Sequence, residues 1–242
     1  MNAPSVLVDF GGEQHHATAL KPLTIGREGD VSISDNPYLH RRFLLIERAG
    51  NLWWLANTGS RLSVTVADPD GLMQAWLGPG TRLPLVFDHT KAWFTAGPTT
   101  YEVSLHHSDA LFSPVGSTDS VDGVTTMGRI SLTHDQRLML LALAEPVLRR
   151  GERGEGMLPT NAQAARRLGW TVTKFNRKVD NVCDRLARHG VRGLHGEPGD
   201  LAAGRRARLV EYAVATRLLT ASDLGLLDEP PDPPQGSSAH SG

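Results

Sequence analysis

The sequence has a single cysteine and no long apolar run, and both scarcities limit what the protein can be. Cys183 is the only cysteine among 242 residues, so the chain cannot form an internal disulfide or a cysteine-based zinc site. No apolar run approaches the roughly 18 residues that a membrane span requires, and the first residues lack the basic and apolar pattern of a secretory signal. We therefore expect a cytoplasmic protein without a membrane segment.

Motifs for catalysis and cofactor binding are also lacking. The sequence contains no Walker-type glycine loop, no Rossmann glycine triplet after a strand and no GxSxG nucleophile elbow. Its ten histidines are scattered or paired, without a carboxylate spaced to complete a metal site. We expect no catalytic residue, no metal site and no cofactor, and we predict that the protein is not an enzyme.

The net charge of −1 hides an uneven distribution along the chain. Residues 161–218 contain twelve basic and five acidic side chains, a net charge of +7, whereas residues 219–242 contain four acidic side chains and no Lys or Arg. A local positive excess is typical of a surface that meets a polyanion, because each Lys or Arg placed against a phosphate releases counterions. A solvated helical face would give the same excess, so the charge alone leaves both possibilities open.

The first 105 residues predict a β-sandwich. Short apolar or alternating runs recur between turn-forming Gly, Pro, Asn and Asp residues, as they do in two packed sheets. The expected strands are 5–10, 23–25, 43–46, 52–55, 62–66, 83–87 and 101–105. Residues 106–130 lose this periodicity and are rich in Ser, Thr, Gly and Asp, which predicts a flexible linker.

Residues 131–227 predict a helical domain. Apolar residues three and four apart indicate a first helix that ends near Arg150, before the glycine-rich segment 151–156. Residues 228–242 are acidic and Pro-rich, then rich in Ser and Gly, and predict a disordered tail. The expected fold class is therefore multidomain β + α, with a sandwich before the linker and helices after it.

Two short helices with a tight turn are predicted inside the helical domain. Thr160 and Gln163 form a capping box that starts a helix, and Gly169 is suited to end it. A second helix over 171–188, capped by Thr171 or Thr173, follows after one or two residues. A small Ala165 on the first helix and a bulky Phe175 on the second complete the pattern of a helix-turn-helix.

The outward face of the second helix predicts contacts with double-stranded DNA. Arg is suited to guanine, Asn to adenine and Lys to the phosphate backbone. The candidate DNA-binding residues are Thr173, Lys174, Arg177 and Asn181, with Lys178 on the flank. Asp180 and Asp184 would repel phosphate, so the N-terminal half should make the contacts. An αα-hairpin that binds no nucleic acid would have the same spacing.

Residues 158–179 resemble the helix-turn-helix of bacterial response regulators and of sigma factor region 4. The resemblance implies that the helix over 171–188 is the one that enters the major groove. It covers about a fifth of the chain at most.

Three strings in the sandwich, at 25–30, 36–46 and 57–61, resemble a forkhead-associated (FHA) domain in order and spacing. FHA domains are β-sandwiches whose loops bind phosphothreonine peptides, and the resemblance spans roughly residues 5–105. It retains Gly26, Arg27, Ser60 and Arg61 of the family pattern. His40 stands in place of the phosphate-binding Ser. Phe43 replaces the structural His, and Leu62-Ser63 replace the expected Asn-Gly.

A phosphothreonine pocket can also be argued from chemistry. Phosphothreonine carries about −1.5 to −2 charges and three acceptor oxygens, so its pocket needs cationic or hydrogen-bonding donors on neighbouring loops. The candidate residues are Arg27, His40, Arg41, Ser60 and Arg61. A protonated His40 would serve as a cationic donor in place of a hydroxyl. Leu62 cannot donate to a peptide backbone, so binding is weak or relaxed, or the sandwich makes phosphate-independent contacts instead.

These expectations combine into two alternative functions. The first is a regulatory protein that couples an FHA-like module to a DNA-binding helix-turn-helix. Its partners are double-stranded DNA and a protein, phosphorylated on threonine if the pocket retains phosphate binding. The second is a non-enzymatic adaptor in which both domains bind proteins and the basic helices meet an acidic partner.

Overall fold

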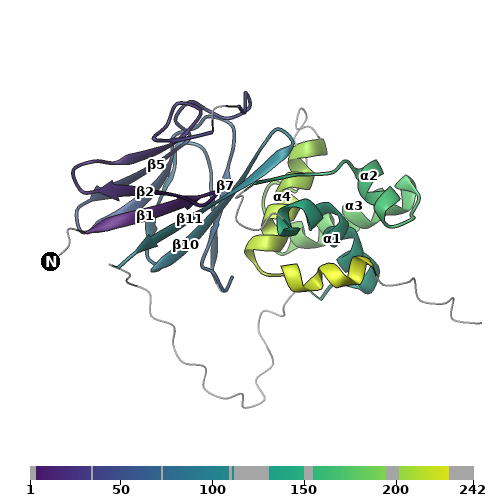
Figure 1. The fold of residues 1–242 in the computed structure, drawn as a ribbon. Helices are drawn as coiled ribbons and strands as arrows, with labels where there is room; N and C mark the ends of the chain where they lie inside the picture. Colours follow the sequence, from purple (N-terminus) through teal and green to yellow (C-terminus); the bar gives the residue numbers. More distant parts are fainter. Residues whose placement is uncertain are drawn as a thin grey trace, which may run out of the picture.

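The computed structural model describes residues 4–33, 35–71, 73–108, 111, 131–149, 155–194 and 202–228. Strands dominate its N-terminal half and helices its C-terminal half, and the helices pack beside one sheet of a β-sandwich (Figure 1). The strands of the sandwich are β1 (Ser5–Phe10), β2 (Glu13–Thr18), β3 (Leu23–Gly26), β4 (Val31–Ser32), β5 (Leu44–Ala49), β6 (Leu52–Asn57), β7 (Val64–Ala67), β8 (Gln74–Leu77), β9 (Arg82–Leu85), β10 (His89–Ala96) and β11 (Thr99–His107).

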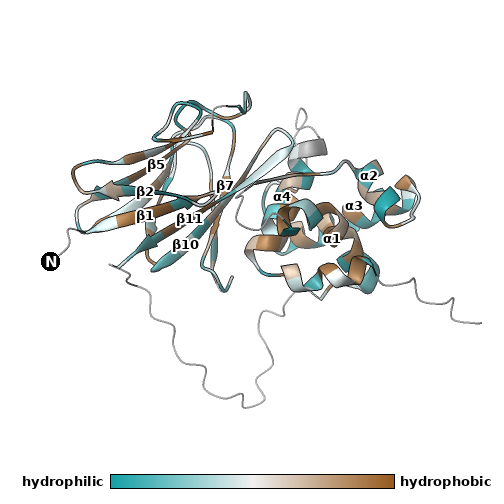
Figure 2. Ribbon diagram, in the orientation of Figure 1, coloured by the Kyte–Doolittle hydropathy of each residue, from teal (hydrophilic) through white to brown (hydrophobic). Residues whose placement is uncertain are grey.

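The strands form two sheets that face each other across an apolar core. One sheet has the order β2-β1-β11-β10-β7-β8, and the short strand β12 (Glu155–Met157) joins it by pairing with β11. The other has the order β4-β3-β5-β6-β9. Along β5 and β6 buried side chains alternate with more exposed ones, as a half-buried sheet requires. Figure 2 shows hydrophobic residues, in brown, along strands of the sandwich and in α1. The Phe43 and Phe94 rings meet inside this core, with centroids 4.8 Å apart.

The structure confirms the two-sheet sandwich and places a strand at every expected position. It adds β2, β4, β8 and β10, which the sequence reading missed. The edge strand β2 shows why, because Ala17 is its only buried side chain and no apolar alternation marks it. β11 continues through His107, so the strand takes up the first two residues of the expected linker. Most of the rest of that linker, 109–110 and 112–130, lies outside the described residues.

The helical half is organised around one central helix. Its elements are α1 (His134–Arg149), α2 (Asn161–Arg167), α3 (Val172–Arg188), α4 (Ala202–Ala215) and the 3-10 helix η2 (Ala221–Leu227). Residues 139–144 of α1 are all buried, because the other helices and β12 surround it. α1 ends at Arg149, next to the predicted end.

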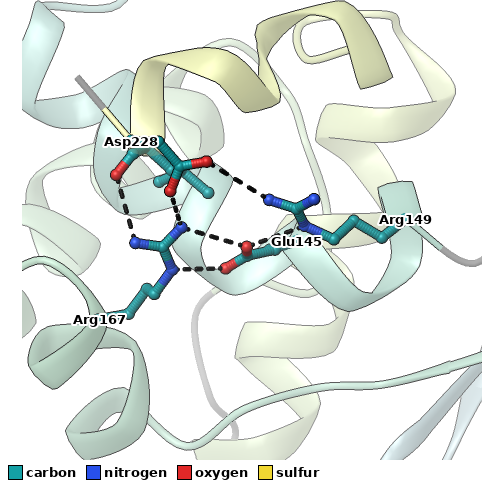
Figure 3. Close-up of polar contacts among 5 residues, drawn as sticks. Glu145, Arg149, Arg167 and Asp228 are labelled. Atoms are coloured by element: carbon teal, nitrogen blue, oxygen red, sulfur yellow. Dashed lines mark hydrogen bonds and ion pairs between the residues drawn. The ribbon is translucent and has the colours of Figure 1, made fainter.

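An ion-pair cluster joins α1, α2 and the end of η2 (Figure 3). Glu145 of α1 accepts hydrogen bonds from Arg149, at 3.0 Å, and from Arg167 of α2, at 3.1 Å. Arg167 also donates to the Asp228 carboxylate at 2.6 Å and to the Leu227 carbonyl oxygen at 3.3 Å. Asp228, the first residue of the expected disordered tail, is therefore fixed to the helices, and 229–242 lie outside the described residues.

The helical half also contacts the sandwich directly, through α4 on the outer face of the first sheet (Figure 1). The carboxylate of Glu211, which is 5% exposed, accepts hydrogen bonds from Thr95 Oγ1 at 2.6 Å and from Thr65 Oγ1 at 3.2 Å. The guanidinium of Arg208 is also buried and donates to the Thr65 hydroxyl. We call these residues of α4, β7 and β10 the α4 interface. The two halves are therefore joined by direct packing at the α4 interface as well as by the chain between them.

Candidate functional site

All five residues predicted for phosphopeptide binding line one pocket of about 270 Å³ at an end of the sandwich. Its walls come from three loops, which follow β3, precede β5 and follow β6. The lining residues are Arg27, Tyr38, Leu39, His40, Arg41, Phe43, Gly59, Ser60, Arg61 and Leu62. We call it the loop-end pocket. The strings that were far apart in sequence thus meet in space.

Backbone hydrogen bonds hold the first two loops together. The Arg27 N–H donates to the His40 carbonyl oxygen at 3.2 Å, and the Glu28 N–H donates to the Arg41 carbonyl oxygen at 2.8 Å. Gly26 lies so close that a Cβ there would collide with the Arg41 carbonyl oxygen. The close approach therefore requires glycine before Arg27, and it places Arg27 beside His40 and Arg41.

The third loop is shaped by Asn57, a residue that the sequence analysis did not single out. Asn57 is 1% exposed, and its Oδ1 accepts from the Gly59 N–H at 3.0 Å while its Nδ2 donates to the Leu62 carbonyl oxygen at 2.8 Å. Gly59 packs on the Phe43 ring, where a Cβ would approach Cδ2 to 2.8 Å. Phe43 is fully buried, so it supports the pocket from within the core, as its place in an apolar run indicates.

The polar side chains around the pocket are mainly those of arginines. Arg27 is half-buried, and its Nε is buried without a hydrogen-bond partner among the described residues. Ser60 and Arg61 are exposed. Arg41 pairs with Glu28 at 3.3 Å, but its side chain is 70% exposed and can move to a ligand. The pocket therefore offers an anion several donors from different loops.

His40 is oriented by a backbone contact. Its Nδ1 lies 2.7 Å from the Arg42 carbonyl oxygen, so Nδ1 must carry the hydrogen of that bond. Nε2 then carries a second hydrogen only when the ring is protonated. His40 can thus donate to an anion at Nε2 as imidazolium, whereas the neutral ring would present a lone pair.

The two helices predicted for DNA binding are present with the predicted caps. Thr160 accepts from the Gln163 N–H at 3.2 Å, and Gln163 accepts from the Thr160 N–H at 2.8 Å, which is the capping box of α2. Gly169 has φ 65°, the left-handed conformation expected after a helix. Thr171 caps α3 by accepting from the Lys174 N–H at 3.2 Å. Of the two predicted candidates, Thr171 and Thr173, it is Thr171 that caps α3.

The predicted DNA-contacting residues do not all face solvent in the same way. Thr173, Arg177 and Asn181 are exposed along α3. Lys174 and Lys178 instead turn toward α1, where their Nζ atoms lie 3.6 Å and 3.0 Å from Asp135 Oδ2.

Asp135 responds to the two lysines. Burial alone would raise the pKa of its carboxyl, but the hydrogen bond from Lys178 and the charge of Lys174 lower it below its usual value. Asp135 therefore neutralises part of the charge that Lys174 and Lys178 could offer to phosphate, and their contact with DNA stays a prediction.

Other arginines in the basic segment are also engaged. Arg205 pairs with Asp180 at 2.6 Å, and Arg208 lies in the α4 interface. Burial lowers the pKa of Arg206. Among the described residues, Arg166 and Arg177 are exposed cations without an ion-pair partner near the α2–α3 turn. The net +7 of this segment therefore overstates the charge that its surface offers to a polyanion.

No group of three or more His, Cys, Asp or Glu side chains in the described ranges could hold a metal ion. Burial raises the pKa of the Cys183 thiol to about 11, so this thiol is a poor nucleophile near neutral pH. None of the described helices is long and apolar enough to cross a membrane.

Comparisons with known proteins identify similar solved structures only. No family model matches the sequence, and neither does any curated protein. The FHA-1 domain of Rv1747 from Mycobacterium tuberculosis is 15% identical and matches 44% of this chain and 98% of its own, with a TM-score of 0.33. The FHA domain of an Arabidopsis thaliana hypothetical protein is 17% identical and matches 48% of this chain and 92% of its own, with a TM-score of 0.32.

Proposed function

We propose that the protein is a non-enzymatic regulator whose loop-end pocket binds a phosphorylated peptide, with phosphothreonine as the ligand. The observation that carries this proposal is the meeting of Arg27, His40, Arg41, Ser60 and Arg61, from three loops, around one opening. A phosphate group with charge near −2 accepts several charge-assisted hydrogen bonds at once, and donors on separate loops match that geometry.

Each residue has a distinct role in this proposal. Arg27 is the inner donor, because its Nε is already buried and lacks a partner that a phosphate oxygen would supply. Ser60 and Arg61 donate from the third loop, and Arg41 contributes after leaving Glu28. Protonated His40 donates through Nε2. Asn57 is a positioning residue, since its amide is fully used in holding the third loop.

Matched peptides test the proposal. Threonine peptides are taken from a degenerate library, and each is prepared with and without the phosphate. Both forms are titrated against the full chain by fluorescence anisotropy. Arg27→Ala should weaken phosphopeptide binding about ten- to a hundredfold, because a charge-assisted hydrogen bond contributes about 1.5–3 kcal/mol. Arg82→Ala is the matched control, since Arg82 stacks on Trp54, 4.4 Å from its ring centre, and does not line the pocket. Equal affinity of wild type for both peptides would rule the function out.

A second candidate function is binding of double-stranded DNA by α3. It is supported by two capped helices joined through Gly169 and by the exposure of Thr173, Arg177 and Asn181 on α3. Because Lys174 and Lys178 are paired with Asp135, we propose that Arg177 and Asn181 make the base contacts and that few phosphates are contacted. With both activities, the protein would be a regulator that binds a phosphopeptide through the sandwich and DNA through α3.

An unbiased selection tests the second function and separates it from a protein adaptor. Purified protein is incubated with a random duplex library, and enrichment of a motif is expected. Arg177→Ala should then reduce affinity for the enriched duplex by about 1–3 kcal/mol, whereas Arg149→Ala, an exposed arginine of α1, serves as control. A selection that enriches no motif favours the adaptor, in which the helical half binds an acidic protein.

A further inference from the structure

Two lysines of α3 share one carboxylate oxygen of α1. The Nζ atoms of Lys174 and Lys178 lie 3.6 Å and 3.0 Å from Asp135 Oδ2. The two lysines are one turn apart, so they reach the same atom from one side of α3. Arg177 lies between them in sequence, but it is exposed and has no ion-pair partner among the described residues. The first half of α3 therefore carries two engaged cations and one that is open to a ligand.

Asp135 is held beside the lysines by the first turn of α1. Thr133 and Gln136 form a capping box, in which the Gln136 N–H donates to Thr133 Oγ1 at 3.3 Å and the Thr133 N–H donates to Gln136 Oε1 at 3.1 Å. Gln136 Oε1 also accepts from Arg185 Nη2 of α3 at 3.2 Å, which joins the start of α1 to α3. The dipole of α1 stabilises a carboxylate in this turn. Contacts other than those of the lysines thus fix the position of Asp135.

Lys174 has a further contact that restrains it. Its Nζ lies 3.9 Å from the centre of the Trp170 ring, in the turn between α2 and α3, and Trp170 packs on the helical core. The side chains of Lys174, Lys178 and Asp135 are 43%, 27% and 37% exposed. A DNA phosphate can therefore approach the lysines, but it must replace the carboxylate to bind them.

Sequence-independent binding of DNA depends on such lysines. Each Lys or Arg that meets a phosphate releases counterions, and this release supplies nearly all of the non-specific affinity. A lysine that is already paired with a carboxylate contributes less, because part of its charge is neutralised before DNA arrives. Contacts of Arg177 and Asn181 with base edges require neither lysine.

We propose that Asp135 is an internal competitor of the DNA phosphate, which holds Lys174 and Lys178 back and so restrains sequence-independent binding by α3. The proposal rests on the second candidate function, because it concerns the same face of α3. Asp135 touches no DNA itself and acts through the two lysines, so it is a positioning residue. The wild-type protein then relies mainly on base contacts, which favours its own site over random DNA.

The salt dependence of binding tests this role. A duplex of random sequence is titrated with the full chain by fluorescence anisotropy, at NaCl concentrations from about 50 to 200 mM. Asp135→Asn removes the charge and keeps the side-chain shape. It should bind about tenfold more tightly at the lowest salt and steepen the slope of log affinity against log salt by about one to two, since each freed lysine adds about 0.9. Asp70→Asn is the matched control, because it removes an equal charge and opens an exposed ion pair, with Arg217, that involves no residue of α3.

A second substitution shows whether the lysines carry the gain. Lys178→Gln should reduce affinity for the random duplex about threefold more in the Asp135→Asn background than in the wild-type chain. Urea denaturation confirms that each variant is folded. Equal reductions in the two backgrounds would show that Asp135 does not act through Lys178 and would overturn the proposal.

The outcomes separate the competitor role from the function on which it rests. If the selection enriches a motif but Asp135→Asn and Asp70→Asn give the same affinity and salt slope, the competitor role is overturned and DNA binding stands. If the selection enriches no motif and neither wild type nor Asp135→Asn binds the random duplex at the lowest salt, both fail. A steeper slope in Asp135→Asn alone, reduced again by Lys178→Gln, supports the proposal.

Discussion

At the loop-end pocket, three arginines come from separate loops. Arg41 and Arg61 are exposed and Arg27 is half-buried. Beneath α4, Arg208 and Glu211 are buried against the hydroxyls of Thr65 and Thr95. The two regions use similar residue types, but solvent reaches one and is excluded from the other. An exposed cation keeps its hydration until a ligand replaces it, whereas a buried charge depends on the groups around it.

The difference teaches how the two halves of the molecule are related. In the pocket, the unpartnered Nε of Arg27 and the exposed side chains of Arg41 and Arg61 are open to a ligand that comes from outside. In the α4 interface, donors and acceptors of the helical half bond to donors and acceptors of the sandwich. These groups therefore hold the two halves together and are not open to an outside ligand. The small apolar cluster of Ala67, Trp93 and Ala215 adds to this contact. The helical half is therefore a packed partner of the sandwich.

The largest effect is expected from breaking the α4 interface on its cationic side. Arg208→Met keeps much of the side-chain volume but leaves the Glu211 carboxylate buried without a compensating charge. We expect a loss of about 3–5 kcal/mol in the free energy of unfolding at pH 8, measured by urea denaturation. The double variant with Glu211→Gln should recover part of the loss. Asp70→Asn is the control, because it removes the exposed partner of Arg217 across the same interface and should cost under about 1 kcal/mol. Equal losses for both single variants would contradict the comparison.

The same interface should make stability depend on pH. Burial raises the pKa of Glu211 from its ordinary value of 4.5 to about 7, although hydrogen bonds from Thr95 oppose the shift. The pKa of Glu211 is higher in the folded than in the unfolded protein. The contribution of its protonated carboxyl to the free energy of unfolding is therefore fully present below about pH 4.5 and is lost as pH rises through 7. We expect the free energy of unfolding to fall by about 3 kcal/mol between pH 5 and 8. Glu211→Gln should flatten this dependence in parallel urea titrations, and an unchanged slope would show that another group titrates.

The sequence predicted the sandwich because its signals are local, as the apolar alternation along β5 and β6 shows. The grouping of the pocket residues was expected from the resemblance of three separate strings to one family, and not from a local pattern. The caps of α2 and α3 were predicted, from Thr160 and from either Thr171 or Thr173, because a cap bonds to a residue three positions away.

The sequence could not predict the α4 interface or the pairing of the lysines on α3. Glu211 bonds to Thr65 and Thr95, which lie 146 and 116 positions away, so no local pattern marks it as buried. On a helical wheel, Lys174 and Lys178 belong to the polar side of α3, and only the packing of α1 brings Asp135 beside them. Charge counted along the chain therefore overestimated the cationic surface.

A smaller effect is expected at Asn57, which is buried like the α4 interface but serves the pocket. Asn57→Ala removes the bonds to Gly59, Leu62 and Leu77 and should lower the free energy of unfolding by about 2 kcal/mol. Because those bonds shape the third loop, phosphopeptide affinity should fall as well, as measured by anisotropy on folded protein. Asn51→Ala, in the exposed turn between β5 and β6, should change neither quantity. Loss of stability with unchanged affinity would show that the loop does not need this support.

The smallest effect is expected where a short ion pair is exposed. Arg167 and Asp228 approach to 2.6 Å, the same distance as Thr95 and Glu211, but their side chains are 35% and 63% exposed (Figure 3). If burial rather than distance decides the contribution of a polar contact, Asp228→Asn should cost less than about 1 kcal/mol in urea denaturation, and the difference should shrink further in 1 M NaCl. Glu145→Gln is the sharper comparison, because Glu145 is 19% exposed and accepts from both Arg149 and Arg167. Its loss should exceed that of Asp228→Asn, and the reverse order would mean that distance governs these contacts after all.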